Sequence, residues 1–400
     1  CTEQQELKEN RLNKLIVKKA AVLGAGVMGA QIAAHLANAN VPVVLFDLPA
    51  RDGDKNGVVT KALDGLKRLE PGPLANKGRL KFIDAANYDE HLPLLAECDL
   101  VIEAIAERMD WKNDLYAKIA PHLSADAVIA SNTSGLSINM LADTLPAAIR
   151  PRFCGIHFFN PPRYMHLVEI IPTRSSDAGT LDALETWLTS RLGKGVIRAL
   201  DTPNFVANRI GVVSILAVMH HTAAFGLGFD EVDALTGPRI GRPKSATYRT
   251  ADVVGLDTLA HVVQNMQDTL PDDPWHRHFA VPAWLRALIE KGALGQKTRG
   301  GIYRKQGRDI QVLDVGLQDY RVSGGAIADD VARLEDQFTR TWQRVPTGPE
   351  RQGLIDDFVR NEIWYREAVA LGLDRDDAVL PRRLRQKMEF IYEDIGALAE

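Results

Sequence analysis

The chain has 400 residues, 46% of them apolar, so it is long enough to bury the cores of two or three compact domains. A net charge of −4 and a pI near 6.2, without a dominant basic stripe, argue against a nucleic-acid partner. Three scattered cysteines, a polar start without the apolar region of a signal peptide, and the lack of a long apolar run predict a cytoplasmic protein without a membrane partner.

Short apolar, β-branched runs alternate with amphipathic stretches from Leu15 to about Ala199. This alternation is typical of parallel strands joined by crossover helices. Helical apolar spacing occurs in residues 28–40 and 111–123. The predicted strands cover residues 15–24, 41–47, 99–107, 127–134 and 152–159. The sequence therefore predicts an α/β domain with a largely parallel sheet over residues 1–200.

Strand patterns end near Asp201, where long helical patterns begin with residues 203–228. We place the main domain boundary there and predict an all-α domain over residues 201–328. From about Asp329 the composition shifts to charged helices rich in arginine, which predicts a helical appendage over residues 329–400.

A glycine-rich motif directly follows the first predicted strand and opens a helical stretch. In that context the pattern G-x-G-x-x-G is typical of dinucleotide binding. The first glycine allows a tight turn, the second lets a pyrophosphate approach the backbone, and the third lets helix and strand pack closely. The N-terminus of the helix then faces the phosphates. The predicted cofactor-binding loop consists of Gly24, Ala25, Gly26, Val27, Met28 and Gly29.

Asp47 ends the next predicted strand, about twenty residues beyond the loop. A carboxylate there accepts hydrogen bonds from the ribose 2′-hydroxyl of NAD and repels the 2′-phosphate of NADP. The alternative is a solvated aspartate at a strand end. Together the loop and Asp47 predict a Rossmann-type domain with NAD as its cofactor.

A histidine and a glutamate are predicted to face each other in a β-hairpin. Residues 160–162 interrupt the strand that contains His157, because proline has a fixed φ and no N–H group. A second strand over residues 166–171 follows, and a hairpin centred near Arg163 puts His157 and Glu169 at the same distance from its turn. A carboxylate beside an imidazole orients the ring and favours its protonated form, which suits a general base in alcohol oxidation. The alternative is a histidine whose hydrogen bonds are satisfied within the core.

Four further polar residues occupy places where ligands bind. Ser134 and Asn208 have short neutral side chains that suit a substrate hydroxyl or carbonyl, although each could simply cap a helix. Glu107 and Lys112 follow a predicted strand, at the edge where open α/β sheets bind ligands, and the alternative for them is a solvated loop pair.

Two histidine pairs could suggest a metal site. His220 and His221 are adjacent, and His276 and His278 lie among prolines and acidic residues typical of a surface turn. Neither pair has a third ligand at a sensible spacing, so we predict no bound metal.

Over roughly residues 15–325 the chain resembles the NAD-dependent L-3-hydroxyacyl-CoA dehydrogenases of fatty-acid β-oxidation. The motifs GAGVMG, EAIAE, SNTSGLSI, HFFNPPRYMHLVEIIP, DTPNFVANRI and DVVGLDT follow that family in type, order and spacing. The resemblance implies oxidation of (3S)-3-hydroxyacyl-CoA to 3-ketoacyl-CoA, with His157 as the catalytic base, Glu169 as its partner, and Ser134 and Asn208 at the substrate oxygen. It also implies NAD contacts by Asp47, Glu107, Lys112, Asn160 and Lys297.

The resemblance has two limits. The family usually has G-x-G-F-Y where this chain reads RGGIY, which affects the packing around Lys297. After about Asp330 the chain instead resembles the helical N-terminal segment of parvulin-type peptidyl-prolyl isomerases, and we expect this tail to have no activity of its own. Within it, four residues recur at roughly helical spacing and are expected to bury an apolar stripe: Ile363, Trp364, Tyr365 and Leu371.

The motifs resemble most the bacterial subgroup in which the dehydrogenase precedes an enoyl-CoA hydratase domain. The expected partners are a second copy of this chain, in a homodimer, or other β-oxidation enzymes. Two other functions stay open: a different β-hydroxyacid dehydrogenase that uses a lysine base, and a non-catalytic NAD-binding scaffold whose tail binds a partner.

Overall fold

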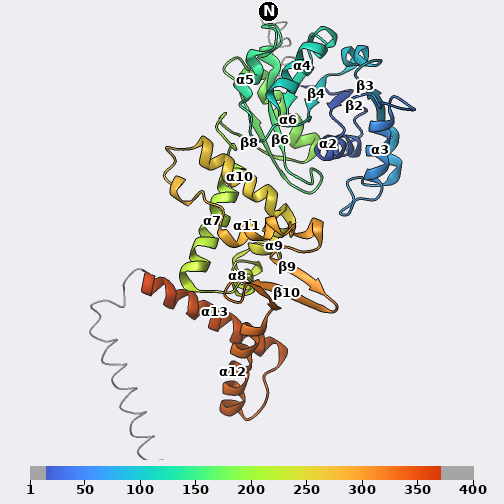
Figure 1. Cartoon of the computed structure of the whole chain (residues 1–400). Helices are drawn as coiled ribbons and strands as arrows, with labels where there is room; N and C mark the ends of the chain where they lie inside the picture. Colours follow the sequence, from blue (N-terminus) through green and yellow to red (C-terminus); the bar gives the residue numbers. More distant parts are fainter. Residues whose placement is uncertain (1–14, 371–400) are drawn as a thin grey trace, which may run out of the picture. The chain divides into compact units, whose positions relative to one another are not determined.

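The computed structural model describes residues 15–370, without the side chains of residues 239, 325–333, 362 and 365–370. The chain forms two compact units (Figure 1). One contains the described residues up to Leu216 together with Ala260–Val281, and the other contains Ala217–Leu259 and the described residues from Pro282 onward. Helices α7 (Ala207–Phe225) and α10 (Leu256–Thr269) contribute residues to both units. The three domains predicted from the sequence have other boundaries than these two units, and they stay predictions.

The first unit is built on an eight-stranded sheet with the strand order β3-β2-β1-β4-β5-β6-β7-β8. Neighbouring strands are parallel, except that β6 and β7 are antiparallel. The strands are β1 (Ala20–Leu23), β2 (Val43–Asp47), β3 (Ile83–Asn87), β4 (Leu100–Glu103), β5 (Val128–Ser131), β6 (Phe153–Phe158), β7 (Leu167–Ile171) and β8 (Gly195–Arg198).

Helices bury both faces of this sheet. Ala20 and Val22 of β1 pack into one apolar cluster, and Ala21 and Leu23 pack into a second cluster, because successive side chains of a strand point to opposite faces. Helices α2 (Val27–Asn38), α3 (Gly57–Leu66) and α6 (Ala178–Leu192) contribute to the first cluster, and α4 (Met109–Ile119) and α5 (Ile138–Asp143) to the second. Burial on both faces explains why these strands are almost continuously apolar.

The second unit is mainly helical and also contains a small sheet. Its helices include α8 (Phe229–Leu235), α9 (Tyr248–Val254) and α11 (Ala283–Glu290). Strands β9 (Tyr303–Gln306), β10 (Asp309–Asp314) and β11 (Asp319–Val322) form an antiparallel sheet in the order β11-β10-β9. The buried carboxylate of Asp252 accepts hydrogen bonds from the backbone N–H groups of Ile302 and Tyr303, both at 2.8 Å, and so ties α9 to the start of β9. The predicted fold class, an α/β domain followed by a helical domain, is confirmed. The small antiparallel sheet in the helical part was not predicted.

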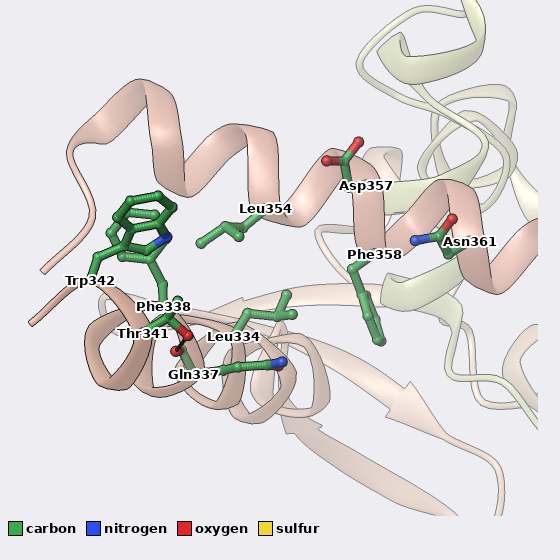
Figure 2. Close-up of a pocket in the computed structure, with 9 residues that line it drawn as sticks. All are labelled: Leu334, Gln337, Phe338, Thr341, Trp342, Leu354, Asp357, Phe358 and Asn361. Carbon is green, nitrogen blue, oxygen red and sulfur yellow. Dashed lines mark hydrogen bonds between the residues drawn. The ribbon is translucent and has the colours of Figure 1, made fainter.

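Two further helices, α12 (Gly325–Trp342) and α13 (Gly348–Ala370), continue the second unit (Figures 1 and 2). Figure 2 shows Leu334 and Phe338 of α12 and Leu354 and Phe358 of α13 around a groove of about 510 Å³. The boundary predicted at residue 329 therefore falls inside α12. The expected burial of the later apolar residues is wrong for Trp364 and Ile363, which are 67% and 37% exposed. The side chain of Tyr365 and the whole of Leu371 lie outside the described part of the chain.

Across residues 15–370, no helix is both long enough and apolar enough to cross a membrane.

Candidate active site

The glycine loop between β1 and α2 has the geometry that a dinucleotide requires. Gly24 has φ +104°, and a Cβ atom there would lie 2.8 Å from the carbonyl oxygen of Ala104. A Cβ atom at Gly29 would lie 1.8 Å from the carbonyl oxygen of Gly24, so only glycine lets α2 approach the turn this closely. At Gly26 an added Cβ would meet nothing within 4 Å. The backbone at Gly26 thus borders open space, where a pyrophosphate fits.

A cavity of about 410 Å³ lies beside this loop, with Gly24, Gly26, Asp47 and Leu48 in its walls. The carboxylate of Asp47 accepts hydrogen bonds from the backbone N–H groups of Ala25, at 2.6 Å, and Leu48, at 2.7 Å. Leu48 is 65% exposed in the wall of this cavity, and its apolar side chain can cover the face of an adenine ring. The Asp47 carboxylate and the apolar side chain of Leu48 together fit the adenosine part of NAD.

His157 and Glu169 meet as the hairpin register predicts. The two residues are paired across β6 and β7, and His157 Nδ1 lies 2.6 Å from Glu169 Oε2. Both side chains are almost completely buried. Since the carboxylate accepts a hydrogen bond from Nδ1–H, the lone pair of His157 Nε2 is left to accept a proton.

Glu169 also connects the hairpin to the start of α7. Its Oε1 atom accepts hydrogen bonds from the backbone N–H groups of Val206, at 2.9 Å, and Ala207, at 2.8 Å. Burial raises the pKa of Glu169, but the hydrogen bonds from His157, Ala207 and Val206 outweigh it, so the pKa lies below its ordinary value. The carboxylate is therefore ionised at neutral pH. It also fixes the first turn of α7, where the half-buried Asn208 lies.

Ser134 lies on the other side of the imidazole ring. Its Oγ atom is 2.9 Å from His157 Nε2. The carboxylate of Glu107 accepts hydrogen bonds from Ser134 N, at 2.5 Å, and from the Thr133 hydroxyl. A continuous chain of hydrogen bonds therefore runs from Ser134 through His157 to Glu169. Glu107 holds the backbone N–H of Ser134 in place.

Aromatic rings restrict the orientation of the imidazole. The ring centroids of Phe159 and Phe205 lie 4.5 Å and 5.5 Å from that of His157, and both pairs meet edge to face. Their apolar edges keep water from much of the imidazole surface.

Asn160 lies close to the cofactor loop. Its side-chain oxygen accepts a hydrogen bond of 3.2 Å from Gln31 Nε2, and Gln31 lies on α2, the helix that follows the glycine loop. Lys297 belongs to the second unit, on the short 3₁₀ helix η7 (Gln296–Thr298), and its ammonium is 2.6 Å from Asp257. The NAD contact of Lys297 stays a prediction.

Lys112 does not fit the direct NAD contact that the resemblance implies. Its side chain is fully buried, and its Nζ atom donates to Glu103 Oε1 at 2.6 Å. Glu103 Oε1 also accepts the backbone N–H of Ile105 at 2.7 Å. A lysine on α4 faces inward here because Glu103 offers a buried counter-charge. Lys112 therefore supports the loop after β4 from inside the fold.

Two further carboxylates, which no sequence pattern marks, hold the site. Glu103 Oε2 accepts hydrogen bonds from Ser131 Oγ, at 2.6 Å, and from the Tyr116 hydroxyl, at 3.0 Å. Asp201 accepts bonds from Ser137 Oγ, at 2.7 Å, and from the backbone of Asn139, at 2.9 Å, and thus fixes the turn beyond Ser134. Both residues lie within quoted motifs, but their partners are distant in sequence and no local pattern marks them.

For the part of the chain that the structure describes, no cluster of three or more histidine, cysteine, aspartate or glutamate side chains could hold a metal ion.

Comparison with known proteins gives two family matches. A model described as the NAD binding domain of 3-hydroxyacyl-CoA dehydrogenase matches residues 19–202, and one described as the C-terminal domain matches residues 205–305.

Similar proteins carry related names. A probable 3-hydroxyacyl-CoA dehydrogenase of Bacillus subtilis is 40% identical over 313 residues, which cover 74% of this chain and 40% of the relative. A protein of the same name from Deinococcus radiodurans is 41% identical over 72% of this chain and 83% of the relative. The crystal structure of (S)-3-hydroxybutyryl-CoA dehydrogenase from Ralstonia eutropha has a TM-score of 0.61 and 29% identity, and the match covers 73% of this chain and 100% of that chain.

Proposed function

Because the chain belongs to the 3-hydroxyacyl-CoA dehydrogenase family, we propose that it oxidises (3S)-3-hydroxyacyl-CoA to 3-ketoacyl-CoA with NAD, as a step of fatty-acid β-oxidation. The observation that carries the proposal is the hydrogen-bond chain from Ser134 through His157 to Glu169. It supplies a base with an available lone pair, an ionised carboxylate behind that base, and a hydroxyl group to orient the substrate oxygen.

The proposed chemistry begins at His157 Nε2, which takes the proton of the substrate hydroxyl. The electron pair of that O–H bond forms the carbonyl bond, and the hydrogen on C3 leaves as a hydride. NAD, when bound, supplies the acceptor for that hydride. Glu169 stabilises the imidazolium that forms, because its negative charge lies 2.6 Å from Nδ1. Ser134 holds the substrate oxygen next to Nε2, and Asn208 is placed at the start of α7 to assist it.

Two observations favour this function over a dehydrogenase with a lysine base. Lys112 is fully buried against Glu103, and Lys194 is buried with its ammonium bound to backbone carbonyl groups. Neither amine is available to a substrate, whereas His157 Nε2 lies 2.9 Å from the Ser134 hydroxyl, the group that would orient the substrate oxygen.

The direct test is to mix the protein with NAD and (3S)-3-hydroxybutyryl-CoA and to follow NADH by absorbance. We expect NADH to form with the 3S substrate and not with its 3R enantiomer, because the base, the hydroxyl group and the cofactor loop define one face of C3. A longer 3S substrate tests for chain-length preference. If NAD binds but no acyl-chain length gives NADH, the proposal is wrong and a scaffold role is supported.

A further inference from the structure

The second unit contains a wide cleft with an excess of positive charge. Its volume is about 1000 Å³, and its walls come from the turn before α9, from η7 and from the β9–β10 hairpin. No residue assigned above to catalysis or to NAD lines it. The cationic side chains in its walls are Lys244, Arg249, Arg299, Arg304 and Lys305.

Part of this charge is not neutralised by the fold. Lys244, Arg299 and Lys305 are exposed, and none has an acidic partner among residues 15–370. Other cations of the same unit are paired, such as Lys297 with Asp257 and Arg321 with Asp230. An unpaired cluster within a concave surface creates a local positive potential, which attracts anions.

The carboxylate that lines the cleft does little to offset these charges. Asp252 is only 7% exposed, and its oxygens accept the backbone N–H groups of Ile302 and Tyr303. Burial is the largest influence on Asp252 and raises its pKa to about 6, which reduces its negative charge further in mildly acidic solution.

Two arginines of the cleft are held in place by aromatic rings. The guanidinium carbon of Arg249 lies 4.0 Å from the ring centre of Tyr303, and that of Arg304 lies 3.8 Å from the ring centre of Tyr320. Arg249 Nε also lies 4.0 Å from the Asp233 carboxylate, and Arg304 Nε donates to Gln311 at 2.8 Å. Stacking and these contacts hold both guanidinium groups, so less side-chain entropy is lost when a ligand binds. These arginines are therefore preorganised for a planar or multidentate anion.

The cleft also exposes apolar surface beside the charges. Val253 and Ile310 line it and are 61% and 46% exposed. An inorganic anion would leave this apolar surface in water, whereas the organic part of a larger ligand would cover it.

We propose that this cleft binds an organic diphosphate, with phosphate oxygens at Lys244, Arg299 and Lys305 and the organic part over Val253 and Ile310. Coenzyme A and nucleoside diphosphates share this chemistry. The site does not depend on the proposed oxidation, because binding is measured without turnover.

The test is isothermal titration calorimetry of the full chain, with NADH at saturation so that the cofactor cavity is filled. The probes are coenzyme A, ADP and inorganic pyrophosphate, each at low and at high ionic strength. The test variant is the double substitution Lys244→Gln with Lys305→Gln, and the matched control is Lys291→Gln, an exposed lysine just beyond α11.

We expect coenzyme A and ADP to bind and the double variant to weaken that binding by about tenfold, since charge-assisted hydrogen bonds are lost. The control variant should bind as the unmodified protein does, and salt should weaken binding in both. Tighter binding of coenzyme A than of ADP would identify the substrate's nucleotide as the ligand, and equal binding would identify a nucleoside diphosphate. The proposal is overturned if no probe binds at low salt, if the double variant binds normally, or if pyrophosphate binds as tightly as the organic probes.

Discussion

His157 is held by groups that come from separate parts of the first unit. Glu169 is on the neighbouring strand, Ser134 follows β5, and Phe205 precedes α7. Each contact has a different effect: Glu169 fixes the tautomer of the imidazole, Ser134 marks the position of the substrate oxygen, and Phe205 limits rotation of the ring. The consequence is that substitutions at the base and at its partner should have distinguishable effects.

Replacing His157 with glutamine should lower turnover by about two to four orders of magnitude, the usual contribution of a general base. Glutamine has a similar volume but cannot take up the proton. NAD affinity, measured by fluorescence titration, should stay the same, because His157 does not line the cofactor cavity. Near-normal turnover would remove His157 from the mechanism.

Replacing Glu169 with glutamine should change the pH dependence of oxidation. The amide oxygen can still accept the N–H groups of Val206 and Ala207, so the start of α7 is preserved. The negative charge that stabilises the imidazolium formed during oxidation is lost, so the pH–rate profile of the variant should differ from that of the unmodified protein. Turnover should also fall. Profiles of the variant and the unmodified protein that superimpose would mean that the Glu169 charge does not act on His157.

Asp47 provides a test of cofactor choice. Asp47→Ala removes the ribose acceptor and the negative charge, so NAD affinity should fall by about tenfold while discrimination against NADP relaxes. Asp47→Asn is the matched control, because it removes the charge but keeps an acceptor for the N–H of Ala25. It should relax discrimination with a smaller loss of NAD affinity. The measurement is the ratio of kcat/KM for NAD and NADP, and an unmodified protein that prefers NADP would contradict the role of Asp47.

At the scale of elements, the connection between β6 and β7 depends on a buried lysine. Lys194 immediately precedes β8, is 3% exposed, and donates from Nζ to the carbonyl oxygens of Met165, at 2.8 Å, and Pro162. Burial lowers the pKa of Lys194 from 10.5 to about 8. Because this connection contains Asn160 and follows His157 directly, Lys194 stabilises the segment between the base and its partner.

The lowered pKa predicts a pH-dependent stability. Between pH 8 and 10.5 the unfolded chain binds more protons at Lys194 than the folded protein does. The free energy of unfolding therefore increases as the pH rises through that window, by up to about 3 kcal/mol from this group. In Lys194→Met this contribution should be missing, while the exposed substitution Lys67→Met should retain it. The measurement is the free energy of urea unfolding at about pH 7.5 and about pH 10. The same pH dependence in Lys194→Met and the unmodified protein would contradict the burial of a charged amine.

Sequence periodicity located the elements with long apolar runs and missed the others. All the strands it placed in the first unit are present, because a sheet buried on both faces favours apolar residues at most positions of its strands. It missed β3 and β8, in which no apolar run is longer than two residues, and the sheet of β9 to β11, whose residues are largely polar and exposed. Such strands form through pairing with their neighbours, which the local sequence does not encode.

At the scale of the whole molecule, α12 and α13 lie beyond every residue assigned to catalysis or to NAD. A salt bridge between Arg351 and Glu335 joins the two helices, and their apolar side chains line the groove of Figure 2. The resemblance of this region to isomerase segments is a prediction that concerns sequence alone.

Truncation after Gly324 tests the independence of this region. The backbone N–H of Gly324 donates to Asp230, so the cut keeps that contact. We expect NAD binding and hydroxyacyl-CoA oxidation to persist and the Tm to fall by a few degrees, because the two helices belong to the compact second unit. Truncation after Ala370 is the control and separates the effect of the two helices from that of residues 371–400. Loss of oxidation in a folded protein that ends at Gly324 would show that the helices contribute to the substrate site.

The amino-acid sequence was enough to determine the position of the glycine loop, the aspartate at the strand end and the pairing of His157 with Glu169. Each follows from short-range rules: a turn that only glycine permits, a carboxylate one strand further on, and the symmetry of a hairpin around its turn. The tertiary structure alone decided which charged groups are buried and what they bind. Lys112 turns inward to Glu103, Glu169 caps the start of α7, and Lys244 and Arg299 meet in one cleft from segments about fifty residues apart. The reason is physical, because the cost of burying or clustering charge depends on partners brought together only by packing.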